Sequence, residues 1–141
     1  MKGKQTALMP GTEDKVGYWL TQPDLMARLQ AEFDFDFDAA PYPRPAGFDG
    51  LKEPWGKRTW VNPPFRARDG KGIDAWARKA IEERDSGKTV VFIGPVYRWI
   101  GRLIAAGAEI RYTPVAWNAP TGLARRGGAV PTCIFILRPK P

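Results

Sequence analysis

The apolar residues of this chain recur in two periods, and the period distinguishes helices from strands. Residues 73–84 and 97–106 carry apolar side chains at helical spacing, and a glycine follows each stretch. Continuous apolar runs predict a central strand buried on both faces at 89–93 and a last buried strand at 132–137. Residues 109–113 predict a further strand. Alternating strands and helices predict an α/β fold with a mostly parallel sheet and helices on both faces.

The amino-terminal half predicts one helix and one strand before a long irregular stretch. Thr21 is a suitable N-cap for a helix that ends near residue 31 or 32. Residues 33–38 alternate strictly between Phe and Asp, which predicts a strand with three Phe on one face and three Asp on the other. Residues 44–58 are irregular and rich in Pro and Gly, and Trp55 among them is interpreted as a packed lid or wall; the alternative is a side chain that stacks on a base.

The length of 141 residues predicts a single domain at 16–141, preceded by a loose basic arm at 1–15. No apolar run approaches a membrane span, and no signal peptide is evident, so a soluble cytoplasmic protein without membrane contact is expected. The single cysteine, Cys133, lies in an apolar run and is expected to be a buried, inert thiol.

The chain contains no histidine, which excludes histidine acid–base catalysis and the usual zinc sites, so no metal is expected. The net charge is +7 and the isoelectric point is near 9.8. This charge indicates an acidic polymer, most simply nucleic acid, as the partner; the alternative is a basic but unspecialised surface.

The stretch from Trp60 to Phe65 predicts a short strand that runs directly into a rigid polar turn. Pro63 and Pro64 forbid ladder pairing, so the chain must leave the sheet after Asn62. In open α/β sheets, ligands bind outside the carboxyl ends of the strands. Hydrogen-bond acceptors beside the ring of Phe65 would suit a planar base that bears an amine. The alternative is a turn that is merely stiffened by proline.

Two basic loops are candidates for phosphate contacts. Residues 66–72 follow the turn directly, and the alternative there is a solvated turn. Residues 114–131 form a connection whose length in a small domain indicates function or disorder. The candidate DNA-binding side chains are Arg66, Arg68, Lys71, Arg125 and Arg126.

Four motifs occur in order within a short span. They are Trp19-Leu20-Thr21-Gln22-Pro23, the stretch from Phe35 to Pro43, Asp49-Gly50-Leu51 with Trp55-Gly56 after it, and Trp60 to Phe65. In this order and spacing, residues 17–137 resemble the small phage-type DNA N6-adenine methyltransferases. The resemblance implies a compact Rossmann-like methyltransferase domain, S-adenosylmethionine as cofactor, double-stranded DNA as partner, and the cytoplasm of a bacterial host for a phage- or prophage-derived protein.

The resemblance also implies roles for four polar residues near the cofactor. Thr21 would lie near the methionine end, and Asp49 would face the adenine amine of the cofactor. Asp38 would be the carboxylate at the end of the first strand, beneath the cofactor, or Asp36 if the register is shifted. The chain departs from the family where Gln22 replaces a proline and where Ala39-Ala40 replaces a Pro-Cys pair.

By the same resemblance, Asn62, Pro63, Pro64 and Phe65 would hold the target base. The Asn62 side chain and the Pro63 carbonyl would accept hydrogen bonds from the amine, so that alignment rather than a strong base supplies the rate. Phe65 would stack on the flipped base, whose extrusion costs a few kcal/mol. Two alternatives remain: an inactive relative that only binds nucleic acid, and a methyltransferase that acts on a protein amide.

Overall fold

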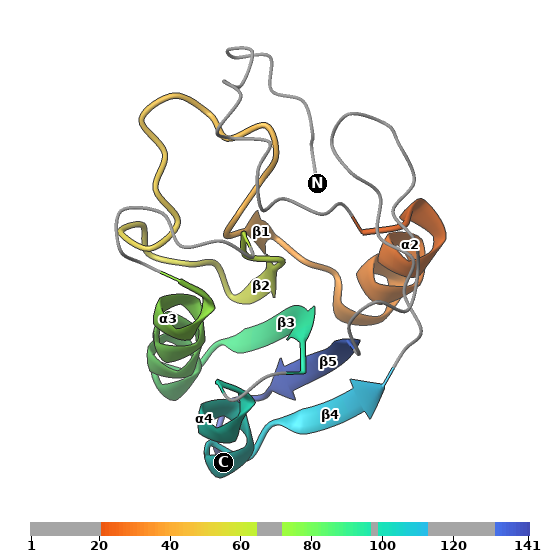
Figure 1. The fold of residues 1–141 in the computed structure, drawn as a ribbon, viewed down its shortest axis with the longest axis vertical. Coiled ribbons are helices and arrows are strands. Elements are labelled where there is room, and N and C mark those ends of the chain that lie inside the picture. The colour runs from red at the N-terminus through yellow and green to blue at the C-terminus, as the bar shows by residue number, and fades with distance from the viewer. Residues whose placement is uncertain (1–20, 65–71, 97–98, 113–131) are drawn as a thin grey trace.

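A computed structural model describes residues 21–64, 72–96, 99–112 and 132–141. Within these ranges, five strands form one sheet and three helices pack around it (Figure 1). No helix in this part of the chain is long and apolar enough to cross a bilayer. The elements are α2 (Pro23–Phe33), β1 (Phe37–Asp38), β2 (Arg58–Val61), α3 (Ile73–Asp85), β3 (Thr89–Pro95), α4 (Ile100–Ala105), β4 (Glu109–Tyr112) and β5 (Thr132–Leu137).

The sheet is mixed, with the strand order β1-β2-β3-β5-β4. β1, β2 and β3 are parallel, whereas β5 pairs antiparallel with both β3 and β4. The α/β class is therefore confirmed, but the expectation of a mostly parallel sheet is corrected to a partly parallel one. The register gives the reason: Thr132 pairs with Pro95 and Cys133 with Tyr112, so the chain re-enters the sheet at the edge where β4 ends.

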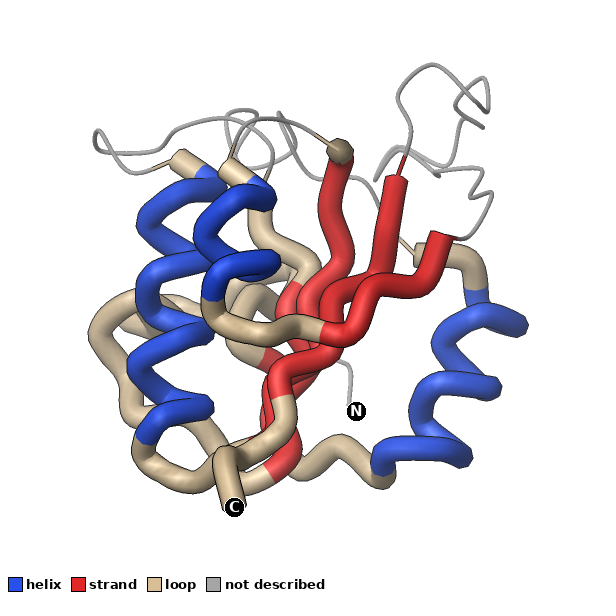
Figure 2. Tube along the Cα trace, turned by 90° about the horizontal axis from the view of Figure 1, so that it is seen from below, coloured by secondary structure: helices blue, strands red, loops and turns tan. Residues whose placement is uncertain are grey.

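Helices cover both faces of the sheet, as the sequence predicts. Figure 2 shows one helix, α2, on one side of the strands and two helices, α3 and α4, on the other. β3 contributes to both layers, because Val90 and Phe92 pack on the α3–α4 side while Val91 and Ile93 pack on the α2 side. A strand between two helical layers needs apolar side chains at every position, which explains the continuous apolar run. β5 is likewise buried throughout, including Cys133, as predicted.

The expected strand at 33–38 is wrong over most of its length. α2 continues through Phe33, and Asp34 ends it in the left-handed conformation with φ of 53°. Only Phe37 and Asp38 form a strand. The three phenylalanines do not share a face either: Phe35 packs in the α2-side cluster, and Phe37 packs against the α3–α4-side cluster. Phe35 and Phe37 pack on opposite faces of the sheet, whereas a regular strand would place both side chains on the same face.

The two expected helix starts also shift. The N-cap of α2 is Gln22 in an extended conformation without a side-chain cap, so Thr21 is not the N-cap. α4 begins at Ile100 rather than at residue 97, and residues 97–98 lie outside the described ranges. α3 and β4 agree with the sequence prediction to within one residue at each end.

Candidate active site

The candidate site lies at one edge of the sheet, where the parallel strands end. β1 ends at Asp38, which pairs with Trp60, and β2 ends at Val61, which pairs with Phe92; β3 continues to Pro95 in the same direction. β4 ends and β5 begins at the same edge, with Tyr112 and Thr132. We call this edge the carboxyl edge. Ligands of open α/β sheets bind outside the carboxyl ends of strands, so this edge is where a cofactor or substrate would be expected.

The turn after β2 leaves the sheet as the two prolines require. Thr59, Trp60 and Val61 are buried, and the strand ends immediately before Asn62. Pro63 is fully buried and Pro64 is buried, so the backbone after Asn62 is held by packing as well as by the proline rings. This rigid exit presents Asn62 at the carboxyl edge in one backbone conformation.

Asn62 contacts Thr21 across 41 residues of sequence. Its Nδ2 donates a hydrogen bond to the Thr21 hydroxyl at 3.1 Å. Thr21 lies two residues before α2, so this bond joins the start of α2 to the end of β2. The Asn62 Oδ1 atom is screened from solvent. The amide is thereby oriented in advance, and a base amine would reach Oδ1 only after the covering atoms move.

Asp38 and Asp36 lie at opposite ends of β1. Asp38 is at the carboxyl edge, where its Oδ1 accepts the backbone N–H of Ala40 at 3.0 Å. Asp36 precedes the strand, and its Oδ1 accepts the backbone N–H of Arg58 at 3.0 Å, where β2 begins. The guanidinium of Arg58 also lies 3.7 Å from Asp36 Oδ2. Only Asp38 therefore shares an edge with Asn62.

Asp49 is placed beside the end of β1 by the turn that carries it. Its Oδ1 accepts the backbone N–H of Leu51 at 3.0 Å, which fixes the carboxylate to its own turn. Gly50 packs so closely on β1 that a Cβ built on it would lie 1.8 Å from the carbonyl oxygen of Ala39. Only glycine fits this contact. The motif Asp49-Gly50-Leu51 thus packs against Ala39, the residue that follows Asp38.

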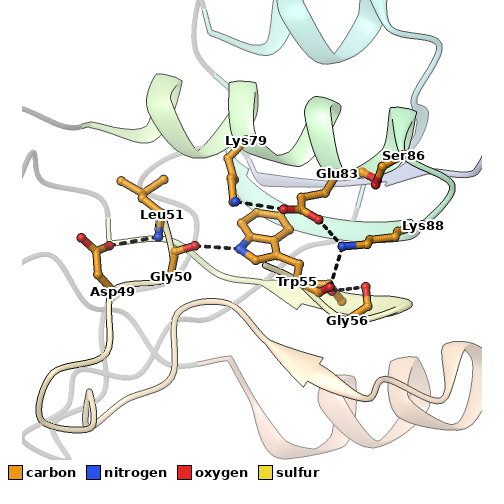
Figure 3. Close-up of polar contacts among 10 residues, drawn as sticks. Asp49, Gly50, Leu51, Trp55, Gly56, Lys79, Glu83, Ser86 and Lys88 are labelled. Carbon is orange, nitrogen blue, oxygen red and sulfur yellow. Dashed lines mark hydrogen bonds and ion pairs between the residues drawn. The ribbon is translucent and has the colours of Figure 1, made fainter. Parts of the chain in front are cut away.

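Trp55 is buried, with 3% of its surface exposed, which confirms that it is a packed side chain. Its indole stacks on that of Trp76 with ring centroids 6.5 Å apart. Figure 3 shows two contacts that sequence analysis missed: a hydrogen bond from Trp55 to Gly50, and a cluster in which Glu83 lies between two lysines. The i,i+4 spacing of Lys79 and Glu83 on one helix is a sequence signal for the charge cluster. Nothing in the local sequence indicates the hydrogen bond from Trp55 to Gly50.

The remaining candidate residues lie outside the described ranges. These are Phe65, Arg66, Arg68, Lys71, Arg125 and Arg126. Their neighbours in the described chain, Pro64 and Gly72 on one side and Tyr112 and Thr132 on the other, border the carboxyl edge or the start of α3. Within the described residues, no group of three or more Cys, Asp or Glu side chains could hold a metal ion.

The structure thus brings together Thr21, Asn62, Asp38 and the turn of Asp49 around the ends of β1 and β2, and it separates Asp36 from them. Carboxylates, a hydroxyl and an oriented amide at a strand edge can bind a polar organic molecule that carries hydroxyl and ammonium groups. No known protein-family model matches the chain, and no curated protein matches it in sequence.

Proposed function

We propose that this protein is an S-adenosylmethionine-dependent methyltransferase, built on a Rossmann-like domain, that methylates the N6 amine of adenine in DNA. The observation that carries the proposal is the hydrogen bond between Asn62 and Thr21 at the carboxyl edge. It places the Asn-Pro-Pro turn next to the start of α2, one strand away from Asp38. The consecutive parallel unit β2–α3–β3 supports the Rossmann-like assignment.

The residues at the end of β1 fit the cofactor. Gly50 covers the carbonyl of the fully buried Ala39, whereas Ala40 is small and only partly buried, so a ligand can approach the chain after Asp38 at Ala40. Asp38 and Asp49 supply carboxylates for hydroxyl, ammonium or amine donors, and Thr21 supplies a hydroxyl. When bound, S-adenosylmethionine supplies a methyl group that is activated by its sulfonium. The chain needs to hold this group beside Asn62.

Asn62 and the Pro63 carbonyl orient the base amine. Their oxygens accept the amine N–H bonds, which turns the nitrogen lone pair toward the methyl group. The two oxygens would hold the amine where the methyl group that S-adenosylmethionine supplies when bound would replace one amine proton, and that proton would pass to solvent. Since the leaving group is already activated, this reaction requires no histidine. Burial of the Asn62 Oδ1 atom and the bond from Nδ2 to Thr21 supply the orientation beforehand.

DNA is the substrate that best fits the charge of the chain. With 22 Lys and Arg against 15 Asp and Glu, the protein attracts a polyanion, and its candidate phosphate-binding arginines flank the carboxyl edge in sequence. The target adenine would be flipped toward Asn62 and stacked on Phe65.

Two measurements test the proposal. Calorimetric titration with S-adenosylmethionine tests the cofactor site, and transfer of a tritiated methyl group to unmethylated duplex DNA tests the reaction. We expect saturable binding and label recovered as N6-methyladenine. Cofactor binding without label in DNA would redirect the proposal to another amine or amide. DNA binding without cofactor binding would replace the enzyme with a nucleic-acid-binding protein.

A further inference from the structure

A buried charge cluster lies under the irregular segment that joins β1 to β2. The Glu83 side chain is 10% exposed and lies between Lys79 and Lys88. Lys79 Nζ is 2.9 Å from Glu83 Oε2, and Lys88 Nζ donates to Oε1. Burying three charges is costly unless their geometry is well satisfied. Lys79 and Glu83 come from α3, and Lys88 immediately precedes β3, so the cluster belongs to the β2–α3–β3 unit.

Trp55 connects this cluster to the candidate site. Its backbone oxygen accepts a hydrogen bond from Lys88 Nζ at 2.7 Å, and Lys79 Nζ lies 5.8 Å from the centre of its ring. In the side chain of the same residue, the indole Nε1 donates to the carbonyl oxygen of Gly50 at 2.7 Å (Figure 3). The bond to Gly50 is buried, which increases the cost of losing it.

The turn that receives this bond is itself compact. The carbonyl of Asp49 accepts the backbone N–H groups of Lys52 and Glu53 at 2.9 and 3.1 Å, and the carboxylate accepts that of Leu51. Gly50 packs against the Ala39 carbonyl at the end of β1. Because neither helix nor strand forms between β1 and β2, the position of the turn depends on its contacts with Trp55 and Ala39.

We propose that Glu83, Lys79 and Lys88 act through Trp55 as positioning residues, which hold the Asp49–Gly50 turn against the end of β1 and thereby set the affinity of the site for its cofactor. The link to the cofactor rests on the proposed function. Each step is a direct contact: the lysines fix the backbone and ring of Trp55, and its indole N–H fixes Gly50. None of the three charged residues belongs to the carboxyl edge.

Trp55→Phe isolates the key bond, because it keeps an aromatic ring and removes the indole N–H. Trp99→Phe is the matched control: Trp99 is also buried, and its Nε1 makes no hydrogen bond within the described chain. Hydrogen exchange of the Leu51, Lys52 and Glu53 amides reports the order of the turn without any ligand. We expect exchange to be about three- to tenfold faster in Trp55→Phe, which corresponds to one lost hydrogen bond, and unchanged in Trp99→Phe.

Cofactor binding provides the second measurement. Trp55→Phe should raise the dissociation constant and the KM for S-adenosylmethionine by about three- to tenfold, while kcat at saturation stays within about twofold. Glu83→Gln should shift both constants in the same direction. Because the two side chains act through one chain of contacts, the double variant should lose less affinity than the product of the single losses. A cluster that only stabilises the fold would give no such coupling.

The outcomes separate this inference from the proposed function. Wild-type protein that fails to bind S-adenosylmethionine contradicts the proposed function, and the exchange data still decide whether the turn is positioned by Trp55. Equal exchange in Trp55→Phe and Trp99→Phe overturns the inference. So does normal cofactor affinity in Trp55→Phe, or a Glu83→Gln effect that is independent of Trp55.

Discussion

The two ends of the β1–β2 pair hold their carboxylates in different ways. At the amino end, Asp36 accepts the backbone N–H of Arg58 and lies 3.7 Å from its guanidinium, so the acid joins two neighbouring strands. At the carboxyl end, Asp38 accepts the N–H of Ala40, two residues further along its own chain. Only Phe37 separates these aspartates in the sequence. Their difference shows that the edge of the sheet, and not the motif alone, distinguishes a structural acid from a candidate ligand.

The same contrast extends to other polar side chains. Away from the carboxyl edge, Arg84 is buried, and its guanidinium binds Asp85 and the carbonyl of Ala106, which joins the ends of α3 and α4. At the carboxyl edge, Asn62 and Asp49 are held by a neutral hydroxyl and by a backbone N–H. These two contacts orient a polar side chain without neutralising a charge, which suits a site that binds a cationic or amine-bearing ligand.

The largest expected effect concerns Asn62. Replacing it with alanine should reduce single-turnover methylation of duplex DNA by about 10²–10³, by analogy with the loss of one preorganised group in other active sites. Cofactor affinity should not change, because the turn remains fixed by two prolines. Thr21→Val should give a smaller loss of rate and Thr21→Ser should retain activity, since serine keeps the hydroxyl that orients the amide. Full activity in Asn62→Ala would remove the base-binding role.

The second prediction compares the two aspartates of β1. Asp38→Asn should weaken S-adenosylmethionine binding by about tenfold to a hundredfold, the range for one hydrogen bond to a charged group. Asp36→Asn should leave that affinity intact and affect only stability, since Asp36 binds Arg58. Calorimetry on both variants decides the matter. The opposite ranking would mean that Asp36 is the cofactor acid and that the site lies elsewhere.

The third prediction concerns the contact that brings the Asp49 turn to the carboxyl edge. Gly50→Ala would place a Cβ 1.8 Å from the Ala39 carbonyl, and a backbone atom cannot move aside cheaply. We expect a loss of about 1–3 kcal/mol in urea unfolding, the usual cost of overpacking, with weaker cofactor binding. Gly101→Ala is the control, because Gly101 lies in α4 and nothing lies within 4 Å of the place that the added Cβ would take. That change should be neutral or stabilising by about 1 kcal/mol.

The smallest expected effect is a pH dependence of stability that arises away from the carboxyl edge. Burial alone would raise the pKa of Glu83, but hydrogen bonds from Lys88 and Lys79 outweigh it, so its pKa lies below the ordinary value of 4.5. Glu83 therefore contributes stability above about pH 4.5, and this contribution is lost as the pH falls through its lower folded pKa. Urea midpoints of the wild type and Glu83→Gln should converge in acid. Parallel curves between about pH 7 and pH 3 would contradict this account.

Much of the fold follows from local pattern. α3 and β3 are recognisable because a helix with one buried face and a strand between two layers impose different periods on their apolar residues. The failure at 33–38 has an equally local cause. Alternating Phe and Asp satisfies a strand, yet Phe33 also completes the last turn of α2, and Asp34 can adopt the left-handed conformation that ends it.

The sequence by itself determined the rigid exit after Asn62, because consecutive prolines forbid both ladder and helix whatever surrounds them. It also determined the presence of a glycine at position 50, but not the carbonyl that this glycine accommodates. Only the tertiary structure decided the antiparallel direction of β5, the bond between Thr21 and Asn62, and the separation of Asp36 from Asp38. These features depend on which distant segments meet, and packing of whole layers, rather than local backbone preference, determines those meetings.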